Sequence, residues 1–222
     1  MSFMKETYSR ALPIWDDCKE TSFVRELQKG TLPMEKFEQY IIQDSIYLKH
    51  YARIYGKAIY HSTTLKDIQM FYSALCFVTD KESAVRLNYL KQFGLTDDDI
   101  ESIAPLPENK NYIVYMLDIA EKGNTCEMLM AVLPCMLSYC YIFRSVASDP
   151  QTKKSWYCDL IEDYANEDYL ENCKIWSGFA EEKCAGLCDC EREELAEIFE
   201  KASRLELGFW EMSYRQHGTI TY

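Results

Sequence analysis

The chain has 222 residues, 48% of them hydrophobic, which favours one large domain with a sizeable core over two small domains. Its 36 acidic and 24 basic residues give a formal net charge of −12, and without a long basic run this charge disfavours binding to nucleic-acid backbones. The first twenty residues carry charges throughout and contain no apolar leader region. We therefore expect a cytoplasmic protein, away from membranes, whose ten cysteines are reduced.

Amphipathic helical patterns follow one another along the chain, separated by glycine, proline and short polar stretches. Gly30 ends a first helical segment, and Pro33 begins the next. Thr96 to Ile100 predicts a capping box and a short helix, followed by a loop from Ala104 to Lys110. The other predicted helices cover about 34–60, 64–93, 111–122, 125–147, 152–164, 168–184 and 191–215. No alternating strand pattern occurs, so we predict an all-α, single-domain multi-helix bundle over 1–222.

Two of the predicted helices place one carboxylate in the middle of an otherwise apolar stripe. Residues three and four apart share a helix face. In the helix at 34–60 that face carries Phe37, Tyr40, Ile41, Asp44, Tyr47, Leu48 and Tyr51. In the last helix it carries Phe199, Ala202, Glu206, Phe209, Trp210 and Tyr214. Burying an unpaired carboxylate costs several kcal/mol and raises its pKa. Asp44 and Glu206 therefore either pair with a buried Arg or Lys or cap a backbone group, or they belong to a functional site.

The stretch from Met128 to Phe143 contains sixteen residues without a charge, fewer than the roughly 18–20 that a membrane span needs. Pro134 cannot donate a hydrogen bond to the carbonyl of Met130, so we expect a kink beside Cys135 that makes room for a ligand. Cys135 is thus a candidate nucleophile, and Tyr139, one turn later, shares its face. Free cysteine is also among the most buried residue types, and Cys135 is equally consistent with ordinary core packing.

The 17 tyrosines suit a pocket for a flat, polar heteroaromatic ligand, because buried rings can stack and their hydroxyls need partners, although most are expected to serve ordinary packing. Other chemistries find little support. No Glu-x-x-His pair for a di-iron site occurs, and no glycine-rich phosphate loop. Three cysteines lie close together in the sequence: Cys184, Cys188 and Cys190. They do not form a zinc-site pattern, because a second pair of cysteines at zinc-finger spacing and a nearby histidine are both missing. The three histidines are the available haem ligands: His50, His61 and His217. We interpret His50 as structural. We expect no metal or cofactor.

Four stretches of this sequence resemble the TenA family of thiaminase II enzymes, in the same order and spacing over almost the whole chain. They are "GTLPMEKFEQYIIQDSIYL" (Gly30 to Leu48), "QDSIYLKHYA" (Gln43 to Ala52), "VLPCMLSYCY" (Val132 to Tyr141) and "ELGFWEMSYR" (Glu206 to Arg215). The resemblance implies the haem-oxygenase-like all-α fold without haem, and a homotetramer. It also implies a hydrolase of thiamin salvage, which converts 4-amino-5-aminomethyl-2-methylpyrimidine to the hydroxymethylpyrimidine and ammonia and hydrolyses thiamin as a secondary activity.

The resemblance also implies roles for single residues. In the cysteine-containing branch of the family the nucleophile directly follows Leu-Pro, which is the position of Cys135. Glu206 matches the proton donor, Asp44 the substrate-binding aspartate, and Tyr47 the tyrosine that raises the reactivity of the cysteine. The matching substrate-pocket residues are Tyr139 and Tyr112. We also predict that Phe209, on the same helix face as Glu206, binds the substrate.

A further family tyrosine, which lies near the glutamate, falls within "IEDYANEDY". Tyr164 fits its position best, but the family often has a glycine next, where this chain has Ala165. Tyr157 and Tyr169 stay open as alternatives.

The chemistry of an aminopyrimidine agrees with these roles. A thiolate adds to a ring carbon while an acid protonates a ring nitrogen, the amino group pushes out ammonia or thiazole, water adds, and the thiol leaves. Three alternatives remain: a relative that acts on another aminopyrimidine or an unrelated amine, a non-catalytic pyrimidine-binding regulatory protein on the same fold, and a haem-binding oxygenase.

Overall fold

The described part of the chain, residues 2–215, has helices as its only regular structure, so the all-α prediction is confirmed. This computed structural model gives the backbone alone for 80–83, and His217 lies outside the described residues. The α-helices are α1 (Phe3–Glu20), α2 (Ser22–Lys29), α3 (Met34–His61), α4 (Leu65–Cys76), α5 (Glu82–Phe93), α6 (Asp97–Ser102), α7 (Pro107–Lys122), α8 (Thr125–Ala147), α9 (Cys158–Ala165), α10 (Glu167–Cys184) and α11 (Asp189–Tyr214). Two short pieces complete them, a π-helix η1 (Phe77–Lys81) and a 3₁₀-helix η2 (Thr152–Lys154).

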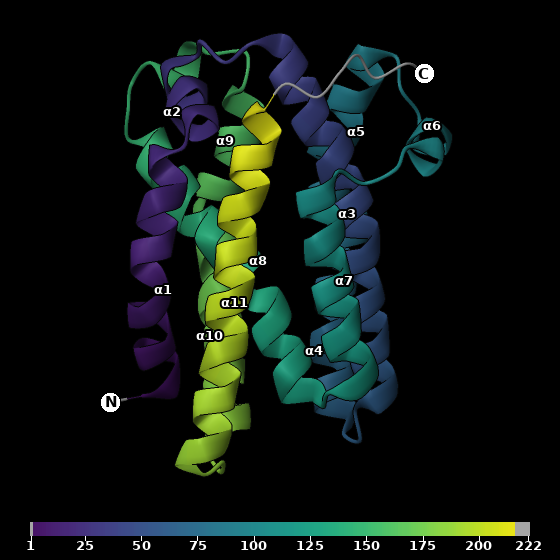
Figure 1. Cartoon of the computed structure of the whole chain (residues 1–222), viewed down its shortest axis with the longest axis vertical. Coiled ribbons are helices and arrows are strands. Elements are labelled where there is room, and N and C mark those ends of the chain that lie inside the picture. Colours follow the sequence, from purple (N-terminus) through teal and green to yellow (C-terminus); the bar gives the residue numbers. More distant parts are fainter. Residues whose placement is uncertain (1, 216–222) are drawn as a thin grey trace.

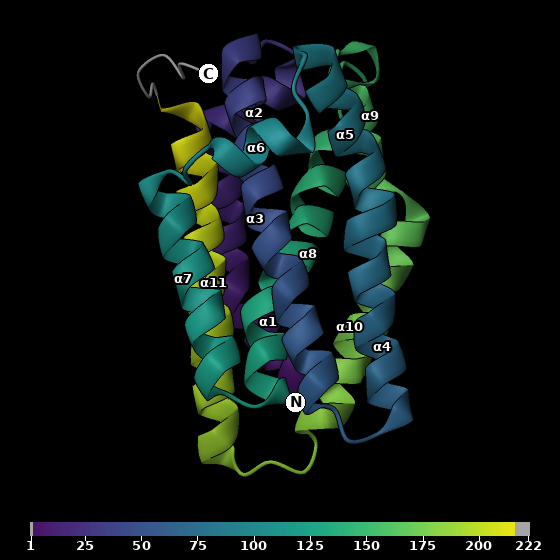
Figure 2. The same ribbon diagram turned by 90° about the vertical axis from the view of Figure 1, so that its right-hand side faces the viewer.

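The long helices run side by side along the long axis of the molecule, and α2, α6 and α9 gather near one end (Figures 1 and 2). Helix α8 packs against α1, α3, α7, α9, α10 and α11, and is therefore the central helix of the bundle. By length and composition it is the one described helix that could cross a membrane, but 83% of its apolar window is buried inside the protein. A core helix of a bundle has these properties too.

Several boundaries follow directly from local capping chemistry. The Asn124 side chain accepts hydrogen bonds from the backbone N–H groups of Cys126 and Glu127, and the Glu127 carboxylate accepts one from Asn124 N–H, which fixes the predicted start of α8. Thr96 forms the predicted capping box with Asp99. Gly30 ends α2 with φ +68°, a backbone conformation that favours glycine.

The first helical segment consists of two helices, because Thr21 interrupts it. Its backbone is extended, and its hydroxyl donates a hydrogen bond of 2.7 Å to the carbonyl of Cys18, a local bond that competes with continued helix. The predicted helix at 64–93 is likewise divided into α4, η1 and α5. A π-turn holds one residue more than an α-turn, and the apolar periodicity around it carries no signal for this insertion.

Two other boundaries were wrong. The predicted loop at Ala104 to Lys110 contains the first turn of α7, because Pro107 occupies a first-turn position at which proline suits a helix. The predicted helix at 152–164 is η2 followed by α9, since Ser155 has extended backbone between them. Ser155 also packs against Gly30, a tertiary contact that no local pattern reveals.

Candidate active site

Asp44 lies within ten consecutive buried residues of α3, 39–48, and is only 5% exposed. A helix buried on every side lies inside the bundle, where polar groups need partners. The neighbouring Gln43 has them: its backbone and side-chain oxygens accept hydrogen bonds of 2.8 and 3.0 Å from the Asn109 amide. This contact ties the first turn of α7 to α3, one turn before Tyr112.

Asp44 lies close enough to Glu206 for its charge to influence the Glu206 carboxyl. Burial raises the pKa of Glu206 to about 8, and the charge of Asp44 adds to this rise, while polar contacts with Tyr112 and Cys135 oppose it. Burial also raises the pKa of Asp44 to about 7, against the attraction of the Arg86 guanidinium. Both acids thus have pKa values raised by burial, a property common among carboxyls of active sites.

Cys135 lies between this acid pair and the surrounding tyrosines. It is 8% exposed, and its thiol contacts the Glu206 carboxyl as a hydrogen-bonding partner. Glu206 is 2% exposed, and its Oε1 atom has no hydrogen-bond partner of ordinary geometry among the described residues. A buried carboxyl oxygen left in this state suits a polar ligand atom. Pro134 lies within a continuous α8, which the structure does not break at this residue.

The tyrosines form an aromatic wall around the acids and the thiol. The rings of Tyr47 and Tyr112 have centroids 4.9 Å apart, and Phe209 lies 6.0 Å from Tyr47. The Tyr139 hydroxyl accepts a hydrogen bond of 3.3 Å from Tyr40, and the pKa of Tyr139 is raised by burial and by nearby groups that include both acids and Cys135. The structure thus brings together all of these predicted residues.

The hydroxyl of Tyr47 donates a hydrogen bond of 3.5 Å to the sulfur of Met116. Burial raises the pKa of Tyr47 well above its usual range, with a further contribution from Cys135. The phenol of Tyr47 is therefore protonated and close to the thiol that it is predicted to influence.

Of the three tyrosine candidates after α8, Tyr164 packs against the predicted pocket residue Tyr139. Its ring centroid is 4.9 Å from that of Tyr139 in an edge contact. Tyr169 packs against Tyr164 at 5.2 Å and lines a cavity beside Cys135. The hydroxyl of Tyr157 donates instead to the Leu32 carbonyl. Tyr164 and Tyr169 thus lie beside predicted site residues, Tyr139 and Cys135 respectively, and the role given to Tyr164 stays a prediction.

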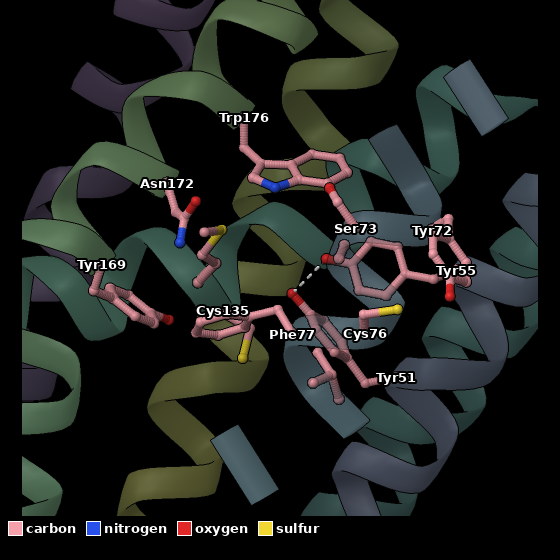
Figure 3. Close-up of a pocket in the computed structure, with 13 residues that line it drawn as sticks. Tyr51, Tyr55, Tyr72, Ser73, Cys76, Phe77, Cys135, Tyr169, Asn172 and Trp176 are labelled. Carbon is pink, nitrogen blue, oxygen red and sulfur yellow. Dashed lines mark hydrogen bonds between the residues drawn. The ribbon is translucent and has the colours of Figure 1, made fainter. Parts of the chain in front are cut away.

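A cavity of about 390 Å³ opens on one side of Cys135 (Figure 3). Of the eight predicted site residues only Cys135 lines it. Its other walls come from α3, α4, η1 and α10, and they include Tyr51, Tyr55, Phe77, Tyr169, Asn172 and Trp176. The thiol therefore stands between the acid pair and a largely aromatic cavity.

Sequence reasoning missed several residues that shape this site. Arg86, which attracts Asp44, donates hydrogen bonds of 3.0 Å to Ser45 and 3.3 Å to Asp97. The α5 sequence gives no signal for this placement. The position of Tyr51 could have been predicted, because it lies on the same helix face as Asp44, two turns later. Its hydroxyl donates a hydrogen bond of 3.0 Å to the Val132 carbonyl of α8, within one turn of Cys135.

Replacing Tyr51 by phenylalanine is expected to destabilise the protein by about 1–3 kcal/mol. The change removes the bond to Val132 and leaves the buried Tyr55 hydroxyl, which donates to Tyr51 at 3.0 Å, without that acceptor. Chemical denaturation of the wild type and the variant measures the difference. Tyr60→Phe, at an 82% exposed position, is the matched control and leaves stability within about 0.5 kcal/mol. An equal effect in both variants contradicts the prediction.

The metal and haem candidates among the described residues do not gather into a metal site. Among the described residues no group of three or more His, Cys, Asp or Glu side chains could hold a metal ion. Cys184 is buried while Cys188 and Cys190 are exposed, so the three thiols face different surroundings. The Nδ1 atom of His50 lies 2.9 Å from the Arg53 guanidinium on the exposed face of α3.

Bundle and site together define a helical protein with a thiol, two raised-pKa carboxyls and an aromatic pocket. A model of the TENA/THI-4/PQQC family matches residues 8–216, and the chain belongs to this family. An aminopyrimidine aminohydrolase of Halalkalibacterium halodurans is 30% identical over 217 residues, which cover 97% of each chain.

Solved structures show the same fold. A TenA homologue of P. horikoshii superposes with a TM-score of 0.86 and 26% identity, covering 96% of this chain and 99% of the other. A domain of unknown function from Shewanella denitrificans, described as having a haem-oxygenase-like fold, superposes with a TM-score of 0.69 at 16% identity over 95% and 91% of the two chains. The predicted haem-oxygenase-like architecture is confirmed.

Proposed function

We propose that this protein is an aminopyrimidine aminohydrolase, a thiaminase II of thiamin salvage. Its main reaction converts 4-amino-5-aminomethyl-2-methylpyrimidine to the 5-hydroxymethyl compound and ammonia, and thiamin hydrolysis is the secondary reaction. The observation that carries the proposal is the contact between the Cys135 thiol and Glu206, whose pKa of about 8 keeps its carboxyl protonated at neutral pH. The full-length similarity to an aminopyrimidine aminohydrolase supports the same reaction.

The reaction begins when the Cys135 sulfur adds to a carbon of the pyrimidine ring while Glu206 donates its proton to a ring nitrogen. Aromaticity is lost, and the electron pair supplied by the 4-amino group expels the amine from the exocyclic methylene. Water then adds to that methylene. The resulting hydroxymethyl intermediate loses the Cys135 thiol, which restores the aromatic ring, and the ring-nitrogen proton returns to Glu206.

Asp44 orients the substrate by accepting a hydrogen bond from the 4-amino group. Arg86 favours the ionised form of Asp44 that this bond requires, since its positive charge lowers the pKa of the carboxyl. The rings of Tyr112, Tyr139, Tyr164 and Phe209 form the faces against which the pyrimidine packs. Tyr47, protonated beside the thiol, stabilises negative charge on the Cys135 sulfur.

The cavity beside Cys135 provides room for the part of the substrate beyond the methylene. Ammonia needs little of its 390 Å³, whereas the thiazole ring of thiamin fits between aromatic walls such as Tyr51 and Trp176. Both leaving groups therefore suit one site.

The same proposal includes the wider setting of the enzyme. The chain folds as a single domain over 1–222, works in the cytoplasm without a cofactor, and assembles as a homotetramer. Its acidic surface, with a formal net charge of −12, suits a small-molecule enzyme better than a nucleic-acid-binding protein.

The purified protein is expected to release one ammonia for each hydroxymethylpyrimidine formed from the aminomethylpyrimidine. A coupled ammonia assay and chromatography of the pyrimidine product measure the two together. Asp44→Asn is the matched variant, because it preserves the shape of the side chain and removes the ionised acceptor, so KM rises at least about tenfold. Binding of the pyrimidine without ammonia release contradicts the enzyme assignment and favours the regulatory alternative.

A further inference from the structure

Two pairs of cysteines connect α8 with α10. The thiols of Cys126 and Cys184 are in hydrogen-bonding contact, and so are those of Cys140 and Cys173. Residue numbers rise along α8 from 126 to 140, while their partners on α10 fall from 184 to 173. The two pairs therefore follow one antiparallel helix packing, and neither contact is an isolated coincidence of surface thiols.

Contacts between sulfur and backbone confirm how closely the helices approach at both places. The Cys126 sulfur lies 4.0 Å from the Lys183 carbonyl oxygen, the residue before its partner Cys184. The Cys173 sulfur lies 3.8 Å from the Met136 carbonyl oxygen, one turn before Cys140. Helices α8 and α10 pack directly against each other, so each of these thiols faces its partner across a helix–helix contact.

The two pairs differ in how easily a reagent reaches them. Cys140 and Cys173 are both buried, whereas Cys126 is half-buried in the first turn of α8 and Cys184 is fully buried behind it. Hydrogen bonding from Cys184, helped by the charge of Lys183, lowers the pKa of Cys126 to about 7, and the pKa of Cys184 rises correspondingly. A substantial fraction of Cys126 is then thiolate near neutral pH, the form that reacts with disulfides.

We propose that Cys126 and Cys184 form a redox-active dithiol, which a low-molecular-weight disulfide oxidises to a disulfide linking the start of α8 to the end of α10. The proposal concerns a modification site outside the catalytic residues and holds whatever the substrate of the enzyme is. Cys140 and Cys173, being shielded, react more slowly.

Each step of this oxidation balances. The Cys126 thiolate attacks one sulfur of the reagent, a bond forms between them, and the first small thiolate leaves. Cys184 loses its proton to that thiolate and attacks the Cys126 sulfur, which expels the second small thiolate. Two protein thiols are oxidised, and one reagent disulfide is reduced to two thiols.

The cross-link would brace the helices that form one side of the cavity. Cys135 on α8 and Trp176 on α10 both lie between the two cysteine pairs, and Figure 3 shows them with Asn172 around the cavity. Joining Cys126 to Cys184 closes a long loop of the unfolded chain, so the oxidised protein should be more stable. We expect an upward shift in Tm on the order of 5–10 °C.

The test is incubation of the full-length protein with glutathione disulfide, followed by intact mass and peptide mapping. We expect the mass to fall by that of two hydrogens, two free thiols to disappear, and one cross-linked peptide pair to contain Cys126 and Cys184. Dithiothreitol should reverse all three changes. The Cys135→Ser variant should form the same cross-link, which separates it from chemistry at the active-site thiol.

Variants of each partner distinguish the steps. Cys184→Ala should stop the reaction at a glutathione adduct on Cys126, while Cys126→Ser should form neither adduct nor cross-link at this site. Cys126→Ser, at a half-buried position, serves alone if the Cys184 variant does not fold. A wild type that keeps glutathione on Cys126, cross-links other cysteines instead, or does not react overturns the proposal.

Discussion

Replacing Cys135 with serine is expected to lower kcat for aminopyrimidine hydrolysis by about a thousandfold or more, with KM changing less than about tenfold. A serine hydroxyl is nearly the size of the thiol but is scarcely ionised at neutral pH, so the covalent addition to the ring loses its nucleophile. The residue is 8% exposed and lies against Glu206, and the substitution leaves the surrounding aromatic walls in place. The loss should therefore fall on the chemical step.

The matched control is Cys140→Ser, because Cys140 is buried on the same helix and does not line the cavity beside Cys135. Its kcat should stay within about threefold of the wild type once folding has been checked by thermal unfolding. Steady-state kinetics on all three proteins, with pyrimidine affinity measured by calorimetry, separates binding from chemistry. A Cys135→Ser variant that keeps a tenth of the wild-type kcat would exclude covalent catalysis by this residue.

The same stretch around Cys135 shows how far local sequence determines the structure. Helix α8 has the predicted bounds because its signals are local: a capping box at Asn124 and a stop after Ala147. The burial of Asp44 and Glu206 was also readable, since each lies on a stripe of apolar residues with helical spacing. Helix bounds and the buried face of a helix depend on patterns within that helix, so its own sequence is enough to predict them.

Features that depend on two distant segments were not predictable in this way. Arg86 lies 42 positions after Asp44, and nothing in α5 indicates that its guanidinium attracts that carboxyl. Tyr51 lay on the predicted stripe, but its hydrogen bond to Val132 depends on how α3 crosses α8. The cavity walls are likewise set by the packing of α3, α4, η1 and α10. The roles given to Tyr47, Tyr112 and Tyr164 came from family resemblance and remain predictions.

Replacing Glu206 with glutamine is expected to make the protein more stable and much less active. A buried glutamate with a raised pKa binds a proton in the folded state at a pH where the unfolded chain has released it. For Glu206 the interval runs from 4.5, its ordinary pKa, to about 8. Stability therefore falls as pH rises through this interval, and the neutral amide removes that fall.

The gain in stability should follow this dependence on pH. Below about pH 4.5 both folded and unfolded states hold the proton, so the two proteins should differ little. At pH 8 and above the variant should exceed the wild type by about 1–3 kcal/mol, after allowing for the cost of burying an amide. Denaturation with urea at pH 5, 7 and 8.5 measures the trend. A stability difference that does not change with pH would contradict it.

Activity should change in the opposite sense because the amide cannot donate the proton that the ring nitrogen needs. We expect kcat to fall about 10²–10⁴-fold, the usual contribution of general acid catalysis. In the wild type kcat/KM should decline as pH rises through about 8, where Glu206 ionises, and this decline should be missing from the residual activity of the variant. A wild-type decline that persists unchanged in Glu206→Gln would assign it to another group. Glu206 would then be a buried acid that costs the fold stability without serving the reaction, whereas loss of both the decline and the rate shows that the reaction requires the buried proton.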